Sequence, residues 1–189
     1  TFWEVIKTDF MALVRDFEEG KLDLQRLNFA LIVLIPKEPD AREMKKFRPI
    51  SLRNCGIFFS KAMTNRVSPV GRRLISSNQT AFIKGRYILE SVVMAHEVIH
   101  EIKKSGSQGL VLKLDYEKAY DRVSWEFLFD MLHSRGFGPK WISWIKSTLI
   151  NSTFSVRIND TTGPYFVGGN GLKQGDPHSP LLFNLVADV

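Results

Sequence analysis

Cysteine is almost absent from this chain, which has Cys55 alone among its 189 residues. A single cysteine excludes an internal disulfide and a cysteine-rich zinc site, and it fits a reducing compartment. No apolar run reaches the roughly 18 residues that a membrane helix needs, and the first residues lack a signal-peptide pattern. These absences favour a protein that works inside the cell, in the nucleus or cytoplasm, and is not secreted.

The chain also lacks an initial methionine, since it begins at Thr1, and its last residues have the pattern of an interrupted helix. We therefore expect a fragment of a longer protein. The hydrophobic content of 44% is enough for one core in a chain of this length.

The net charge of +6 is unevenly distributed. Residues 37–104 carry 14 Lys and Arg against 6 Asp and Glu, whereas residues 105–189 carry 8 of each kind. A basic segment of this kind suits a partner rich in phosphate, although a solvated helix surface would have the same composition. A nucleic-acid-binding role for residues 37–104 is therefore one hypothesis.

Periodicity predicts most of the regular structure. Apolar residues at helical spacing predict helices over 3–17, 55–67, 88–104 and 139–149. Another helix is predicted between a Ser124 cap and Gly136, and Ser179-Pro180 begins a last one. A continuous apolar run predicts a buried strand over 29–35, and alternation predicts a hairpin of 154–158 with 165–167.

A second apolar run occupies residues 109–115. It has the sequence Gly-Leu-Val-Leu-Lys-Leu-Asp and is expected to form a buried strand. The strand would place Asp115 at its C-terminal end, where open α/β sheets usually carry their chemistry. A carboxylate at that place can bind Mg²⁺, whose other ligands usually come from water and substrate phosphates. Taken alone, Asp115 is better interpreted as a residue that begins a turn, and the motifs later in the chain are what favour a metal-binding role.

The segment His96-Glu97-Val98-Ile99-His100 has the spacing of a zinc-protease motif, with two imidazoles on one helix face and Glu as general base. The pattern is short, and a third ligand is required. Neither Glu117 nor Glu126 is well placed to supply it. Solvent-facing helix residues are the favoured interpretation, and a zinc protease remains the third hypothesis.

Several blocks together resemble a known family. Residues 112–123 resemble motif A of reverse transcriptases, and residues 171–183 resemble their motif B. Residues 35–37 and 47–52 are similar to the fingers motifs, and residues 78–86 to the segment that joins fingers to palm. In order and spacing these blocks resemble the LINE-type, non-LTR retrotransposon reverse transcriptases that are abundant in plant genomes.

The resemblance implies an α+β fold, the fingers and partial palm of a right-hand polymerase, with a small antiparallel palm sheet packed by helices. Residues 1–28 would be a helical lead-in and residues 29–189 the partial domain, with fingers at about 29–104 and palm at about 105–189. The implied activity is RNA-directed DNA polymerase, a nucleotidyltransferase that uses two metal ions, Mg²⁺ or Mn²⁺. Its partners would be an RNA template, a DNA primer and deoxynucleoside triphosphates.

The same resemblance assigns roles to motif A residues. Asp115 matches the first metal-binding catalytic aspartate, and the backbone after it, at Tyr116, would contact the triphosphate. Tyr120 matches the aromatic residue that lies under the sugar and excludes a 2′-hydroxyl.

Basic residues and motif B supply the remaining matches. Lys37 and Arg48 match fingers residues that contact the incoming triphosphate, as an ammonium and a guanidinium can. Gln174 and Gly175 match the motif B residues next to the nucleotide and template, where a glycine permits close approach of a ligand.

Three departures from the family pattern stand out. His178 occupies a position that is usually apolar, and residues 53–56 (Arg-Asn-Cys-Gly) differ from the usual run. The family's other catalytic carboxylates come from an aromatic-x-Asp-Asp hairpin, and Asp-Asp occurs nowhere in this chain. We therefore predict that these 189 residues do not polymerise DNA by themselves. The alternative hypothesis is a non-catalytic nucleic-acid-binding remnant that uses residues 37–104.

Overall fold

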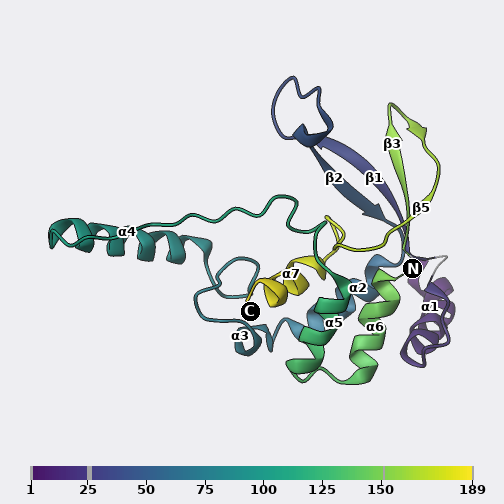
Figure 1. The fold of residues 1–189 in the computed structure, drawn as a ribbon. Coiled ribbons are helices and arrows are strands. Elements are labelled where there is room, and N and C mark those ends of the chain that lie inside the picture. The colour runs from purple at the N-terminus through teal and green to yellow at the C-terminus, as the bar shows by residue number, and fades with distance from the viewer. Residues whose placement is uncertain (1, 25–26, 151, 189) are drawn as a thin grey trace.

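The computed structural model describes residues 2–24, 27–150 and 152–188. Residue 1, where the predicted lead-in begins, and residue 189, where the predicted domain ends, lie outside the described residues. The predicted α+β class is confirmed: helices form one body, and a small sheet extends from it (Figure 1).

The helical body forms where apolar residues recur at helical spacing. It contains α1 (Phe2–Glu18), α2 (Ile57–Val67), α5 (Trp125–Ser134), α6 (Pro139–Leu149) and α7 (Ser179–Ala187), and the short α3 (Gly71–Leu74) lies below α7 in Figure 1. Ser124 accepts a hydrogen bond from the amide of Phe127 and so caps α5, as its sequence position predicts. The innermost side chains, Leu128, Leu132 and Ile145, are fully buried between α5, α6 and their neighbours. Burial of these side chains stabilises the body.

The sheet has the strand order β2-β1-β3-β4, with β5 paired to β3. Its strands are β1 (Phe29–Pro36), β2 (Phe47–Arg53), β3 (Thr153–Ile158), β4 (Thr161–Thr162) and β5 (Phe166–Val167), and the 3₁₀ turn η2 (Met44–Lys46) precedes β2. All pairs are antiparallel except β1 with β3, which is parallel. The predicted strand at 29–35 and the predicted hairpin are therefore confirmed, but the strand is not buried as predicted, since Ala30 is its only buried residue.

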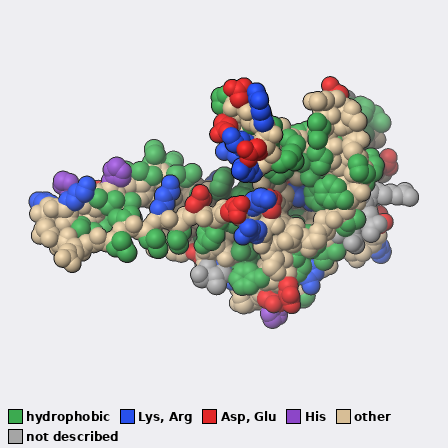
Figure 2. Space-filling view, turned by 45° about the horizontal axis from the view of Figure 1, so that its top comes forward, with side chains coloured by type: hydrophobic (Ala, Val, Ile, Leu, Met, Phe, Trp, Pro, Cys, Tyr) green, Lys and Arg blue, Asp and Glu red, His purple; other side chains and the backbone are tan. Residues whose placement is uncertain are grey.

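Helix α4 (Ile88–Lys104) forms an arm that extends away from the body (Figure 1). The segment of residues 107–116 returns along this arm to the body, and hydrophobic side chains appear on the arm's surface in Figure 2. No residue of α4 is buried. No helix in the described ranges is both long and apolar enough to span a membrane.

The prediction of a buried strand over residues 109–115 is wrong. Residues 107–116 have neither helix nor strand, and Leu110, Leu112 and Leu114 are 92%, 74% and 71% exposed. A strand is stable when a neighbour satisfies its backbone hydrogen bonds and covers one face. Within residues 2–24, 27–150 and 152–188, no strand pairs with this segment. Apolar composition alone therefore does not form a strand here.

Candidate nucleotide site

Backbone hydrogen bonds bring the motif A and motif B segments together. The amide of Gly171 donates to the carbonyl of Val123, and the amide of Leu172 donates to that of Tyr120, both at 2.8 Å. The indole Nε1 of Trp125 also donates to the Gly171 carbonyl at 2.8 Å. A Cβ on Gly171 would lie 2.8 Å from the carbonyl oxygen of Asp121, so only glycine permits this approach.

The next turn, residues 173–176, lies against strand β2. The amide of Ser51 donates to the carbonyl of Gln174 at 2.7 Å. Gly175 has φ +103°, a conformation that is strained for any other residue, and a Cβ there would lie 3.0 Å from the Ser51 carbonyl oxygen. The glycine therefore lets this turn approach β2 closely.

These contacts place Tyr120, Gln174 and Gly175 around one pocket, together with Pro177 and Pro180. Tyr120 is half-buried, and its ring stacks on Phe183 with centroids 5.0 Å apart. Burial raises the pKa of the Tyr120 phenol. The ring thus packs on Phe183 at the wall of the pocket, while Gln174 and Gly175 remain accessible.

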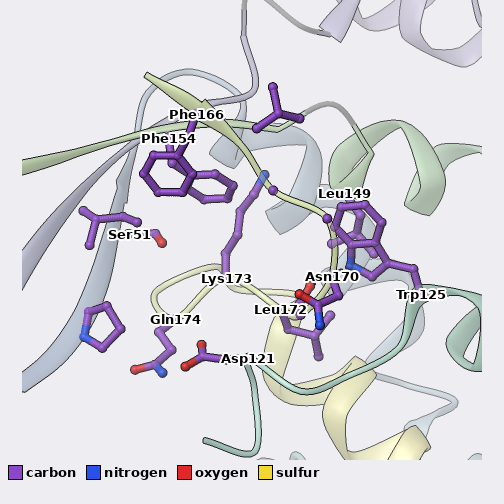
Figure 3. Close-up of a pocket in the computed structure, with 16 residues that line it drawn as sticks. Ser51, Asp121, Trp125, Leu149, Phe154, Phe166, Asn170, Leu172, Lys173 and Gln174 are labelled. Atoms are coloured by element: carbon purple, nitrogen blue, oxygen red, sulfur yellow. Dashed lines mark hydrogen bonds between the residues drawn. The ribbon is translucent and has the colours of Figure 1, made fainter. Parts of the chain in front are cut away.

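A second pocket, with a volume of about 310 Å³, adjoins the first and shares Gln174 and Lys173 with it. Figure 3 shows Asp121 and Gln174 on one side of this pocket and Phe154 and Phe166 on the other. The rings of Phe154 and Phe166 stack with centroids 5.7 Å apart. The site thus combines polar groups on one wall with aromatic faces on the other.

Charged side chains are buried directly behind the turn. Lys173 donates to the side-chain oxygen of Asn28 and to the carbonyl of Thr148 (2.9 Å). Burial, helped by the nearby Arg53 guanidinium and opposed by Asp176, lowers the pKa of Lys173 to about 7. On the other side of the turn, Arg53 forms a buried ion pair with Asp176.

His178 is buried in the same region. Its Nδ1 lies 3.1 Å from the Thr64 hydroxyl, and that hydroxyl donates its own hydrogen to the Ser60 carbonyl at 2.8 Å. Nδ1 is therefore the protonated nitrogen, and Nε2 has no partner among the residues that the structure describes. Burial lowers the pKa of His178 to about 4, although the carboxylate of Asp176 opposes the shift.

Asp115 and Tyr116 lie outside this pocket, on the exposed segment that returns from the arm. In the described part of the chain, no group of three or more His, Cys, Asp or Glu side chains could hold a metal ion. The described side chains therefore form no such cluster, and a cation at Asp115 would take its remaining ligands from water and substrate phosphates.

Lys37 and Arg48 lie at the outer part of the β1–β2 hairpin, and both are exposed. The Lys37 ammonium donates to the Lys45 carbonyl at 2.8 Å. The fold thus brings together Tyr120, Gln174 and Gly175, while these two cations lie apart from that pocket.

The basic side chains of residues 37–104 are distributed over the β1–β2 hairpin, α2, α3 and α4, and some of them pair with acidic neighbours. Basic and acidic side chains alternate at the tip of the hairpin (Figure 2), where Lys45 pairs with Glu43 and Lys46 with Glu38. Arg72 and Arg86 donate to backbone carbonyls of the loops around them. The nucleic-acid-binding remnant therefore stays a prediction.

The zinc-protease hypothesis gains nothing from the structure. His96, Glu97 and His100 are exposed on α4. No third ligand accompanies them within the described ranges. Structural zinc requires four ligands and catalytic zinc three protein ligands.

Sequence reasoning missed the residues that hold the site. Asn28, Lys173 and Asp176 make buried polar contacts with residues more than a hundred positions away: Asn28 with Thr148, Lys173 with Asn28, and Asp176 with Arg53. No local pattern indicated these residues, because Lys173 and Asp176 lie in a glycine-rich turn where polar residues are ordinary.

Comparisons with known proteins found a matching family model and several relatives of similar sequence. The family model described as "Reverse transcriptase (RNA-dependent DNA polymerase)" matches residues 35–189. The "Transposon TX1 uncharacterized 149 kDa protein" of Xenopus laevis is 31% identical over 189 residues, covering 99% of this chain and 14% of that protein.

Two further relatives are Pol polyproteins of R2 elements. The "Retrovirus-related Pol polyprotein from type-1 retrotransposable element R2" of Nasonia vitripennis is 31% identical over 158 residues, or 83% of this chain and 15% of that protein. The corresponding "type-2 retrotransposable element R2DM" protein of Drosophila melanogaster is 28% identical over 167 residues, or 86% of this chain and 15% of that protein. The chain thus spans only 14–15% of the length of these relatives.

Proposed function

Because the chain belongs to the reverse transcriptase (RNA-dependent DNA polymerase) family, we propose that it forms the nucleotide-binding part of a retrotransposon RNA-directed DNA polymerase. One observation carries this proposal. Tyr120 from motif A and Gln174 and Gly175 from motif B line a single pocket, although they are far apart in the sequence. The homology to TX1 and R2 proteins supports a non-LTR element as the source; a plant origin stays a prediction.

In this proposal each residue of the pocket contacts a different part of a deoxynucleoside triphosphate. The Tyr120 ring, which stacks on Phe183, lies under the sugar and leaves no room for a 2′-hydroxyl. Gly175 has no side chain, so its backbone can approach the nucleotide. Gln174 borders the base and the template, and its carbonyl is held by Ser51.

Reverse transcriptases act on a nucleic-acid template and primer. We propose an RNA template and a DNA primer here, held between fingers at about residues 29–104 and palm at about 105–189. The sheet joins these two parts, since β3 pairs with β1. Lys37 and Arg48 on the fingers hairpin would contact the triphosphate after the hairpin and the pocket approach each other.

Reverse transcriptases generally use divalent metal ions. We propose Asp115, on the backbone segment that continues to Tyr116, as the ligand that this chain offers to Mg²⁺ or Mn²⁺. Asp115 is exposed, and in the described residues it belongs to no cluster of three or more possible metal ligands. We therefore expect weak metal binding.

Primer extension on an RNA template tests the catalytic prediction. We expect no synthesis by these 189 residues, because their sequence contains no Asp-Asp pair to complement Asp115. Synthesis that requires Mg²⁺ and disappears in Asp115→Ala would show that the chain carries a sufficient catalytic site.

Nucleotide binding tests the pocket itself. A fluorescent deoxynucleoside triphosphate should bind the unmodified chain, and Gln174→Ala should weaken that binding about tenfold by removing a contact at the pocket wall. Tyr120→Ala should instead reduce the preference for deoxyribonucleotides over ribonucleotides. Tyr165→Ala is the matched control, because Tyr165 is 66% exposed and lies outside the pocket. Equal affinities in all four proteins would refute the proposal.

A further inference from the structure

The accessible residues Gln174 and Gly175 lie between two buried, charged neighbours. Lys173 precedes them and Asp176 follows them, with exposures of 6% and 8%. A polar turn at a pocket normally has solvated charges beside it, because a buried charge must lose its hydration. The burial of both flanking charges therefore requires an explanation.

On the Asp176 side, every carboxylate contact is internal. One oxygen accepts from the Arg53 guanidinium and from the Ser60 hydroxyl (3.0 Å), and the other accepts from the amide of His178 at 2.8 Å. The Arg53 guanidinium also donates to the Ser60 hydroxyl at 2.6 Å. Arg53 and Asp176 side chains are only 1% and 7% exposed, so water does not screen this pair.

On the Lys173 side, Asn28 is the receiving group. Its side-chain oxygen accepts from Lys173 and also from Arg53, at 3.3 Å in the latter case. Its side-chain nitrogen donates to the Thr148 carbonyl at 2.9 Å and to the Ser152 hydroxyl at 2.8 Å. One buried asparagine therefore connects the two cations on either side of the turn.

Gly56 provides the space for this arrangement. A Cβ at position 56 would lie 2.5 Å from the carbonyl oxygen of Leu27 and 3.1 Å from the Arg53 guanidinium. Arg53 and Gly56 both belong to the run that departs from the family pattern. The two departures fit each other, and together they bring the guanidinium to Asp176.

We propose that the Arg53–Asp176 pair and the Lys173–Asn28 contact are positioning elements, which fix the Gln174-Gly175 turn against Ser51 so that it can contact a nucleotide. The inference rests on the proposed nucleotide-binding function and adds residues to it. Stability alone is a weak reason to bury an ion pair, because well-packed apolar residues of similar volume are often equally stabilising. Apolar residues could not fix the position of the turn in the same way, since they form no directional hydrogen bonds to it.

The test compares two ways of removing the ion pair. Asp176→Asn leaves a buried guanidinium without its counterion, and the double variant Arg53→Met/Asp176→Leu replaces the pair with apolar side chains. The matched control is Asp160→Asn, which removes the surface pair of Asp160 with Arg157. Each protein is measured for affinity to a fluorescent deoxynucleoside triphosphate, for urea unfolding, and for hydrogen exchange of the Ser51 amide.

A positioning role predicts that the double variant recovers resistance to urea, while its nucleotide dissociation constant stays raised about tenfold and its Ser51 amide exchanges about tenfold faster. Asp176→Asn should show the same two changes, and Asp160→Asn neither. If Asp176→Asn does not fold, the double variant decides alone.

Recovery of nucleotide affinity and of slow Ser51 exchange in the double variant would overturn the inference, because the pair would then serve stability only. A second outcome is that Gln174→Ala weakens nucleotide binding while the double variant binds as tightly as the unmodified chain. That outcome would overturn the inference and leave the proposed function intact. Failure of the unmodified chain to bind nucleotide would overturn both.

Discussion

Replacing His178 with leucine should remove one contribution to the loss of unfolding free energy that this protein undergoes at acid pH. His178 is 4% exposed, and protonation would add a charge and an Nε2–H group where the described residues offer no acceptor. Burial therefore lowers the pKa of His178 from 6.5 to about 4. Because the folded state resists a proton that the unfolded state accepts, this contribution to stability is complete above pH 6.5 and declines as pH falls toward 4.

The magnitude follows from the two pKa values. One pKa unit corresponds to about 1.4 kcal/mol, so the shift to about 4 predicts a loss of about 2 kcal/mol between pH 8 and pH 5. The loss levels off at about 3 kcal/mol below pH 4. His178→Leu removes the titrating group and keeps an apolar side chain of similar size, so its stability relative to the unmodified protein should rise by about 2 kcal/mol over the same interval.

The assay is urea unfolding, followed by tryptophan fluorescence at pH 8 and pH 5. Carboxylates also titrate in this interval, but their contribution cancels when variant and unmodified protein are compared at each pH. His133→Leu is the matched control, because His133 is exposed on α5. A stability difference for His178→Leu that is the same at both pH values, or an equal pH effect in His133→Leu, would refute the reasoning.

Three further predictions concern the turn and the arm. The free energy of unfolding of the unmodified protein should rise by about 2 kcal/mol from pH 7 to pH 9, because burial lowers the pKa of Lys173 to about 7 and the folded state releases this proton before the unfolded state does. Lys173→Met should show no such rise, and denaturant titrations at both pH values measure the difference. Gly175→Ala should cost about 1–3 kcal/mol, since φ is +103° and the Cβ would lie 3.0 Å from a carbonyl oxygen. Gly169→Ala, in open space, should cost less than about 0.5 kcal/mol, and thermal melts of both variants measure the difference. The double variant Leu110→Glu/Leu112→Glu should reduce aggregation in light scattering without lowering the melting temperature, because both side chains are exposed and unpaired apolar segments self-associate; a large drop in melting temperature would show that the segment is packed.

The helices were predictable because each has a local pattern. Apolar spacing, the Ser124 cap, and Pro139 at the first turn of α6 identify these elements without knowledge of the fold. Strand β1 was also predictable, since its run of seven apolar residues ends at a proline. For these elements the local preference and the final fold agree.

The segment around Leu112 shows where local patterns fail. Its composition is that of a buried strand, yet burial depends on a pairing partner that no local pattern supplies. The ion pair of Arg53 and Asp176 could not be predicted from a local pattern either, because the two residues are 123 positions apart in the sequence. Arg53 looked like a departure from a family pattern, and only the fold shows that it contacts the motif B turn.

The candidate site was predictable in part. The resemblance to reverse transcriptase motifs selected Tyr120, Gln174 and Gly175, which line one pocket in the structure. It also selected Asp115, which lies on an exposed segment away from them. The roles of all these residues remain predictions until binding is measured.

The most direct test of the account is to locate a bound nucleotide by photocrosslinking. An azido-substituted deoxynucleoside triphosphate is irradiated with the chain, and the labelled peptides are identified by mass spectrometry. The account predicts labels in residues 116–122 and 172–180, which disappear when excess unlabelled deoxynucleotide is present. Labels confined to the arm or to the basic hairpin, or labels that excess nucleotide does not reduce, would contradict it.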